Sequence, residues 1–179
     1  MNIPSNIVTI LGTGVWGSAL GAIAQNNNHD VLFWSHRGNV SLESVVSDAA
    51  IVISAVSMKG VIPTIAKLKQ FNFPPEKIIV TATKGLDPET TRTPSQIWQA
   101  AFPDNSVVVL SGPNLSKEIA KGLPAATVVA SNNLTAAEKV QEIFASDTFR
   151  VYVNEDPIGT ELGGTLKNVI AIASGVCDG

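Results

Sequence analysis

The sequence predicts an α/β fold: a doubly wound, mostly parallel sheet, followed by the start of a helical domain. Short apolar segments alternate with segments in which apolar residues recur at helical spacing, which is typical of this class. Several of the short segments are apolar on both faces, as the strands of a parallel sheet are. The expected strands are 7–11, 31–34, 49–56, 77–82, 107–110, 126–130 and 149–153.

The composition indicates a folded, apolar chain. Of its 179 residues 45% are hydrophobic and 15% are charged, and the formal net charge is -3. The absence of a basic surplus argues against nucleic acid as the main partner. The single cysteine, Cys177, excludes a disulfide framework within one chain and suits a reducing compartment. No apolar run is long enough to span a membrane and the first residues lack a signal pattern, so we expect a cytoplasmic protein with no membrane partner. We also expect no metal site.

The strongest local signal is a glycine motif directly after the first strand. Residues 7–11 run into Gly12-Thr13-Gly14-Val15-Trp16-Gly17, and a helix is expected from 18 to 25. A strand, G-x-G-x-x-G and a helix together indicate a dinucleotide site of the Rossmann type. We expect Gly12 to allow a tight turn, Gly14 to let backbone approach a pyrophosphate, and Gly17 to let the helix pack closely. Without that context, the three glycines would fit an ordinary turn.

The end of the second strand bears on the choice of cofactor. An NAD site expects Asp or Glu there to bind the ribose 2′-hydroxyl, whereas this chain has Ser35-His36-Arg37. Asp30 lies at the wrong end of the strand. A cation at this position can hold a 2′-phosphate, which favours NADP. The alternative is that Arg37 is only a solvated loop residue.

The middle of the chain supplies a second candidate site residue. A weak helical stripe lies within 38–50, and a helix is expected over 61–70 with Pro63 in its first turn. Lys84 follows the strand at 77–82, at the edge where open α/β sheets bind ligands. Its alternative reading is a solvated loop lysine.

Further helices are expected on either side of a second glycine-containing turn. A helix is expected over 94–101, and the strand at 107–110 leads into Ser111-Gly112-Pro113-Asn114. We expect Asn114 to cap a helix over 115–121. Thr135-Ala136-Ala137-Glu138 reads as a capping box that opens a helix ending at Ala145.

The last element is a helix from Asp156 to about Gly175. Asp156 can cap it and Pro157 fits its first turn. Helical spacing places Gly164, Lys167, Asn168 and Ala171 on one face. This face suggests the close approach of a ligand, while helix–helix packing at the glycines is an equal alternative. If no partner covers them, Val169, Ile170, Ile172 and Val176 would form an exposed patch that promotes association.

Four separated motifs together resemble the soluble NAD(P)-dependent glycerol-3-phosphate dehydrogenases of bacteria. They are residues 12–17, Thr83-Lys84-Gly85-Leu86, residues 111–114, and Glu161-Leu162-Gly163-Gly164-Thr165-Leu166-Lys167-Asn168-Val169-Ile170-Ala171. The motifs span nearly the whole chain in the family's order, and the last is highly specific. The resemblance implies hydride transfer between NADP or NAD and dihydroxyacetone phosphate, giving sn-glycerol 3-phosphate for glycerophospholipid synthesis.

The resemblance also implies roles for individual residues. It makes Lys167 the general acid/base. The implied cofactor-binding residues are Gly12, Gly14, Val15, Trp16, Gly17, His36, Arg37, Lys84 and Ser116. The implied substrate-binding residues are Lys84, Gly112, Asn114, Lys167 and Asn168.

The sequence departs from the family in three places. Asn114 stands where the family usually has Ser or Thr, and the stretch between Arg37 and Ala49 is shorter than the family's insert. The family also continues beyond the position of Gly179 into a helical domain that supplies further substrate contacts. We therefore expect residues 1–155 to form the dinucleotide-binding domain and 156–179 to be the first helix of a substrate domain otherwise absent. On this interpretation the chain alone binds the dinucleotide and is inactive.

Other functions stay open on the sequence. A different two-domain dehydrogenase, of the ketopantoate or 6-phosphogluconate type, would share the first domain, although the motif at 163–168 argues against it. A dinucleotide-sensing module without turnover would need the glycine motif but not two lysines in these settings. The sequence also allows a homo-oligomer.

Overall fold

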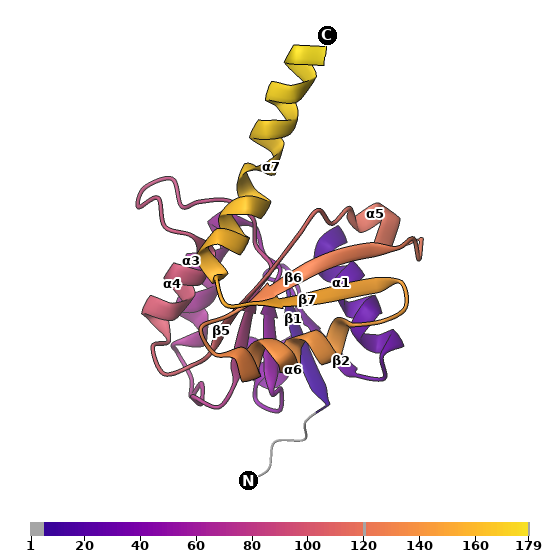
Figure 1. Cartoon of the computed structure of the whole chain (residues 1–179). Helices are drawn as coiled ribbons and strands as arrows, with labels where there is room; N and C mark the ends of the chain where they lie inside the picture. The colour runs from indigo at the N-terminus through magenta and orange to yellow at the C-terminus, as the bar shows by residue number, and fades with distance from the viewer. Residues whose placement is uncertain (1–5, 120, 179) are drawn as a thin grey trace.

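A seven-stranded sheet forms the centre of the molecule (Figure 1). The computed structural model describes residues 6–119 and 121–178. The strands lie in the order β2-β1-β3-β4-β5-β6-β7. Their bounds are β1 Ile7–Leu11, β2 Asp30–Trp34, β3 Ile51–Ser54, β4 Ile78–Thr81, β5 Val107–Ser111, β6 Ala125–Ala130 and β7 Phe149–Asn154.

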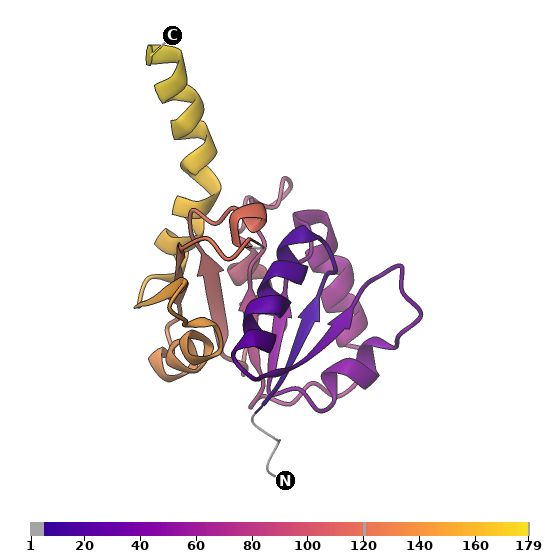
Figure 2. The same cartoon turned by 90° about the vertical axis from the view of Figure 1, so that its right-hand side faces the viewer.

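Helices cover both faces of this sheet (Figures 1 and 2). Apolar side chains of α1 and α6 pack on one face, and those of α2, α3 and α4 pack on the other. Because both faces are covered, β3, β4 and β5 are buried along their whole length. The helix bounds are α1 Val15–Asn26, α2 Leu42–Val46, α3 Met58–Leu68, α4 Pro94–Ala101, α5 Ser116–Ile119, α6 Leu134–Phe144 and α7 Pro157–Asp178.

The pairing of the strands confirms the predicted doubly wound, mostly parallel sheet. Strands β1 to β5 pair in parallel, as do β6 and β7. The exception is the β5–β6 pair, which is antiparallel with Val109 opposite Ala130. The carboxyl ends of β1 to β5 therefore share one edge of the sheet.

The strand order locates a crevice at that edge. From β1 the chain crosses to β2 on one side and then to β3 on the other side. Ligands of open α/β sheets bind at such a switch point, outside the carboxyl ends of the strands. The short stretch between Arg37 and Ala49 contains α2 and no strand, so β2 is the edge strand next to this crevice.

Two expected helix starts were wrong because other residues make the first turn. Helix α3 begins at Met58, so Pro63 is its sixth residue and not a first-turn residue. Helix α6 is capped by Asn133, whose side chain accepts the Ala136 N–H, and not by Thr135. By contrast, α4 has the expected bounds, fixed by a capping box between Thr93 and Gln96.

The turn after β5 also differs from the expectation. The described part of the predicted helix over 115–121 is a single turn, Ser116–Ile119, and residue 120 lies outside the described residues. Asn114 does not cap it. Its Nδ2 donates to Thr127 Oγ1 at 3.0 Å, and its buried Oδ1 has no hydrogen-bond partner within the described residues.

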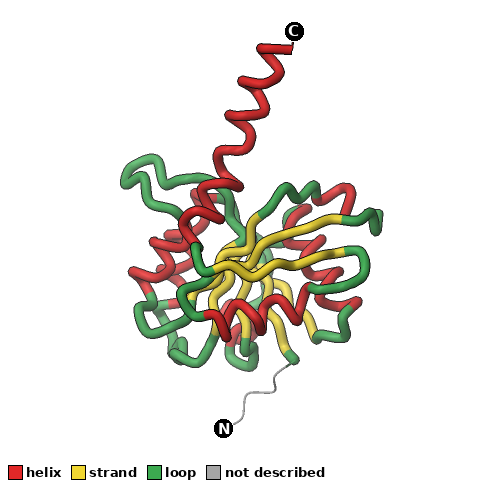
Figure 3. The backbone as a smooth tube through the Cα atoms, viewed as in Figure 1, coloured by secondary structure: helices red, strands yellow, loops and turns green. Residues whose placement is uncertain are grey.

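The last helix packs on the sheet with its first turns and then projects away from it (Figures 1 and 3). As expected, Asp156 caps it: Asp156 Oδ1 accepts the Gly159 N–H at 2.8 Å. In the projecting part, the side chains of Val169, Ile170, Ile172 and Val176 are 63 to 75% exposed. Across the described ranges, no helix is both long and apolar enough to cross a membrane.

Candidate active site

The glycine loop between β1 and α1 has the geometry that its sequence predicts. Gly12 has a φ of +115°, and a Cβ there would lie 2.7 Å from the carbonyl oxygen of Ala55. A Cβ at Gly17 would overlap the carbonyl oxygen of Gly12. A Cβ at Gly14 would have no atom of the described residues within 4 Å, apart from those of its neighbours in the chain. The loop is thus closed against β3 on one side and open at Gly14 on the other.

The start of α1 offers an anion site at this opening. Gly14 is the N-cap residue, no side chain caps the helix, and no acidic residue occupies the first turn. The first N–H groups of a helix without a capping side chain can donate to a phosphate, which the helix dipole also favours.

A cavity of about 490 Å³ adjoins the glycine loop. Its walls are Gly12 to Gly14, the chain after β2, the chain after β3, and one side of α3. Among the described residues that line it are four basic ones and no carboxylate. The basic residues are His36, Arg37, Lys59 and Lys67. An anionic ligand would therefore meet only positive or neutral groups, although the whole chain has a net charge of -3.

A second cavity, of about 310 Å³, lies on the other side of the loop. Its lining includes Trp16, Lys84, Asn114 and Ser116, four of the residues predicted for the site. Trp16 is fixed in its wall because its Nε1 donates to the carbonyl oxygen of Ala82 at 3.1 Å. Val15, also predicted for the site, is 67% exposed and lines neither cavity.

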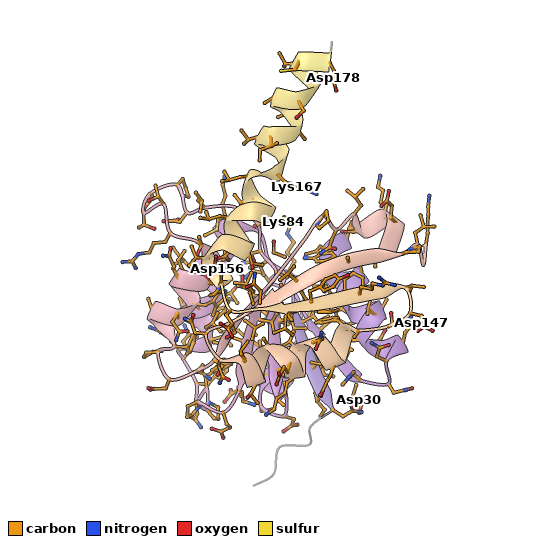
Figure 4. The ribbon with its side chains drawn as sticks, viewed as in Figure 1. Asp30, Lys84, Asp147, Asp156, Lys167 and Asp178 are labelled. Atoms are coloured by element: carbon orange, nitrogen blue, oxygen red, sulfur yellow. The ribbon has the colours of Figure 1, made fainter. Side chains whose placement is uncertain are left out.

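Lys84, in the chain after β4, and Lys167, on α7, lie near each other at the carboxyl edge of the sheet (Figure 4). Lys84 Nζ donates to the carbonyl oxygen of Gly112 at 3.2 Å. Partial burial of its ammonium group lowers the pKa of Lys84, and the positive charge of Lys167 lowers that pKa further. Two cations at one edge would stabilise a phosphate or a developing oxyanion.

Helix α7 is positioned by close packing and by a hydrogen bond. A Cβ at Gly164 would overlap Ser111 Oγ, whereas around Gly163 no atom lies within 4 Å. The Gly85 N–H donates to Thr165 Oγ1 at 3.2 Å. Gly164 thus lets α7 pack closely against β5, a helix–strand contact and not the helix–helix contact that the sequence left open. Gly163 borders a cavity of about 380 Å³ that Lys167 also lines, together with Gly112.

Glu161 is a buried anchor of α7 for which sequence reasoning assigned no role. Its side chain is 3% exposed, and its carboxylate accepts the Ser95 N–H at 3.0 Å and the Ser95 hydroxyl. Burial raises the pKa of Glu161, while the hydrogen bonds from Ser95 and Thr93 oppose that rise. Because Ser95 lies in the first turn of α4, the carboxylate joins α7 to the N-terminus of α4. The only sequence signal was that Glu161 is the one acid in the motif at 161–171.

Comparison with known families identifies the chain. The model of the NAD-dependent glycerol-3-phosphate dehydrogenase N-terminus matches residues 7–42 and 37–137, and the model of the C-terminus of the same family matches residues 156–179. The chain belongs to the NAD-dependent glycerol-3-phosphate dehydrogenase family. This confirms the resemblance that the four motifs carry.

Relatives of known activity support the same family. The chain is 63% identical over 172 residues to glycerol-3-phosphate dehydrogenase [NAD(P)+] of Acaryochloris marina and 60% identical over 172 residues to that of Synechocystis sp.. Each match covers 96% of this chain, and they cover 56% and 54% of the two relatives. The chain therefore spans about half the length of the curated relatives that it matches.

A solved member of the family has the same fold. The crystal structure of glycerol-3-phosphate dehydrogenase from Coxiella burnetii matches with a TM-score of 0.87 and 27% identity, over 97% of this chain and 61% of that one. The structure from Plasmodium falciparum, at 22% identity and a TM-score of 0.85, shares the fold.

Most of the residues expected of a dehydrogenase site lie along the carboxyl edge of the sheet. Gly12, Gly14, His36 and Arg37 line the larger cavity, and Gly112 and Lys167 line another. Asn168 follows Lys167 in α7, and its side chain lies outside the described part of the structure. Within residues 6–119 and 121–178, no group of three or more His, Cys, Asp or Glu side chains could hold a metal ion.

Proposed function

We propose that the protein transfers a hydride between NAD(P)H and the central carbon of dihydroxyacetone phosphate, giving sn-glycerol 3-phosphate. One observation carries this proposal: an open glycine loop and the Lys84–Lys167 pair lie at the same edge of one sheet. The first feature suits a dinucleotide, and the second suits a small phosphorylated carbonyl compound. Membership of the family supports the combination.

The residues present fit a nicotinamide dinucleotide. The pyrophosphate would lie at Gly14, where no atom blocks its approach and where the α1 N–H groups lack a capping side chain. The cavity with His36 and Arg37 would hold the adenosine half. The cavity bounded by Trp16, Lys84 and Ser116 would hold the nicotinamide half. When bound, the cofactor supplies the hydride and the protein supplies position and charge.

The two lysines provide the proton and the charge that the reaction needs. As the central carbon gains a hydride, its carbonyl oxygen gains negative charge and then a proton. We assign the proton to Lys167, which becomes neutral as the alcohol forms and is reprotonated from solvent. Lys84, held by Gly112, stabilises the developing oxyanion and the substrate. We also assign Gly112, Asn114 and Asn168 to the substrate site.

We further propose a domain boundary at residue 155. Residues up to 155 would form the dinucleotide-binding domain, and α7 would begin a helical substrate domain. The separate family model that starts at residue 156 supports this division, as does the projection of α7 from the sheet (Figure 3). The exposed apolar side chains of α7 support a further helical partner, from that domain or from a second copy of the chain. A cytoplasmic location and a role in phospholipid synthesis belong to the same proposal.

A direct assay separates this function from its alternatives. Dihydroxyacetone phosphate should drive the oxidation of NADPH or NADH by the full-length protein. Ketopantoate or 6-phosphogluconate chemistry in its place would assign the protein to another dehydrogenase class. Dinucleotide binding without turnover of any of these compounds would indicate a sensing module.

A further inference from the structure

One helix face in the adenosine cavity carries a cation that the glycine motif and the second-strand loop do not explain. Lys59, Gly60, Pro63, Thr64 and Lys67 all line the cavity from α3. Their spacing of four residues places them along a single side of the helix. Between the two lysines this side presents small or compact residues, so the lysines are the groups on it that can bind an anion.

Lys67 is the better positioned of these two lysines. Its Nζ lies 5.5 Å from the centroid of the Trp34 ring, within the range of a cation–π interaction. Trp34 is itself 5% exposed and is the last residue of β2, so its ring is a fixed platform. Lys67 is half-buried, whereas Lys59 is exposed. An ammonium group held in this way loses little side-chain freedom when it binds a ligand.

The same tryptophan connects Lys67 to the loop after β2. The His36 ring lies 6.3 Å from the Trp34 ring in an edge arrangement. Ser35 shapes the loop, since its Oγ accepts the Arg37 N–H at 3.3 Å and its carbonyl oxygen accepts the Gly38 N–H at 3.0 Å. His36, Arg37 and Lys67 thus surround the position where the ribose 2′ group of a dinucleotide lies in this fold.

We propose that Lys67 is a specificity-determining residue that binds, together with Arg37, the 2′-phosphate of NADP(H). The inference rests on the proposed function only in so far as the cavity binds the adenosine half of a dinucleotide. Among the described residues that line the cavity, no carboxylate is present to accept a hydrogen bond from a free 2′-hydroxyl, while Arg37 and Lys67 provide cations for a 2′-phosphate from two separate segments. The 2′-phosphate is dianionic or nearly so and accepts charge-assisted hydrogen bonds from both.

The test measures binding of two adenosine nucleotides by calorimetry and needs no turnover. Adenosine 2′,5′-bisphosphate carries the 2′-phosphate, and adenosine 5′-monophosphate lacks it. Lys67→Met should weaken binding of the bisphosphate by about tenfold or more and leave binding of the monophosphate little changed. Lys67→Arg should retain most of the affinity for the bisphosphate, because the charge is kept.

Lys69→Met is the matched control. Lys69 lies at the end of the same helix, and its Nζ lies 5.9 Å from an aromatic ring, that of Phe102, but it does not line the cavity. Lys69→Met removes the same charge and should leave the affinities for the bisphosphate and for the monophosphate unchanged. Thermal unfolding midpoints show whether each variant is folded at the titration temperature.

Four outcomes would overturn the inference. If Lys67→Met lost affinity equally for both nucleotides, Lys67 would contact a group that the two nucleotides share and not the 2′-phosphate. If Lys69→Met lost the same affinity for the bisphosphate, the effect would come from the overall charge of the protein. Unchanged affinity of Lys67→Met for the bisphosphate would show that Lys67 does not contact the 2′-phosphate. If the unmodified protein bound neither nucleotide, the dinucleotide site of the proposed function would fail as well, so the two failures are distinguishable.

Discussion

Lys167 on α7 lies near Lys84, which follows β4 more than eighty residues earlier in the chain, so that its positive charge adds to the effect of partial burial in lowering the pKa of Lys84. The two lysines meet because Gly164 allows α7 to pack against Ser111 and because Thr165 accepts the Gly85 N–H. Lys84 and Lys167 (Figure 4) concentrate positive charge at the carboxyl edge of the sheet. The glycine loop opens at the same edge. Helix packing therefore creates the electrostatic part of the site.

The charge coupling predicts how Lys84 titrates when its neighbour is removed. Lys167→Met should raise the pKa of Lys84, because the nearby positive charge that disfavours protonation is lost. The shift is measurable by NMR on isotope-labelled lysine or from the pH dependence of lysine modification. Lys139→Met, at an exposed position of α6, is the charge-matched control and should leave the pKa of Lys84 unchanged. An unshifted pKa in Lys167→Met would mean that the two ammonium groups do not interact.

The buried carboxylate of Glu161 predicts a pH-dependent part of the stability. Burial raises its pKa above the ordinary value of 4.5, so the folded protein keeps a proton that the unfolded chain has released. The resulting stabilisation is complete below pH 4.5 and is lost as the pH rises through the raised pKa. Glu161→Gln should lack this dependence in denaturant unfolding followed across pH. Glu142→Gln, at an exposed position of α6, should retain it. The same slope in Glu161→Gln and in the parent would contradict the assignment.

Substitutions at the crowded Gly17 and at the open Gly14 should separate effects on stability from effects on dinucleotide binding. Gly17→Ala places a methyl group against the Gly12 carbonyl oxygen and should destabilise the fold by about 1–3 kcal/mol. Gly14→Ala meets no protein atom and should leave the unfolding midpoint nearly unchanged. It should still weaken dinucleotide binding, because the methyl group occupies the space through which a pyrophosphate approaches. Unfolding midpoints and calorimetric titration of both variants measure the two effects. Full dinucleotide affinity in Gly14→Ala would place the pyrophosphate elsewhere.

Arg37 should discriminate between the two nicotinamide cofactors. A charged contact with a phosphate contributes roughly 1.5–3 kcal/mol, so Arg37→Asp should weaken NADPH binding by more than about tenfold. NADH binding should change much less, since an acid at this position can bind a free 2′-hydroxyl. Parallel titration of the two cofactors gives the ratio directly. Equal losses for both would show that Arg37 does not contact the 2′-phosphate.

The elements that sequence reasoning placed correctly are those that local patterns determine. Strands such as Ile51–Ser54 are apolar on both faces, and the glycine loop has a fixed spacing, so both can be predicted without tertiary contacts. Helix starts were less predictable. Asn133 and Thr135 are both good capping residues, and the local sequence does not decide that Asn133 caps the helix.

The site residues that sequence reasoning missed act through contacts between distant segments. Lys67 lies on α3 and acquires its position from Trp34, a residue of β2. In the sequence, Glu161 resembles any exposed acid of a helix. Its carboxylate becomes buried against Ser95 only because α7 packs on the start of α4. Neither contact leaves a pattern within one element. By contrast, Lys84 and Lys167 could be proposed from the sequence, because Lys84 lies just past the carboxyl end of an apolar strand and Lys167 follows two glycines in its own segment.

Turnover of Lys167→Met tests the central claim most directly. The measurement is dihydroxyacetone phosphate-dependent oxidation of NADPH by the full-length protein, with NADPH affinity determined in parallel and Lys139→Met as the control. If Lys167 donates the proton, turnover in Lys167→Met should fall by at least about a hundredfold, while NADPH affinity should stay nearly unchanged because the glycine loop is intact. Lys139→Met should match the parent in both. Near-normal turnover in Lys167→Met would contradict the account.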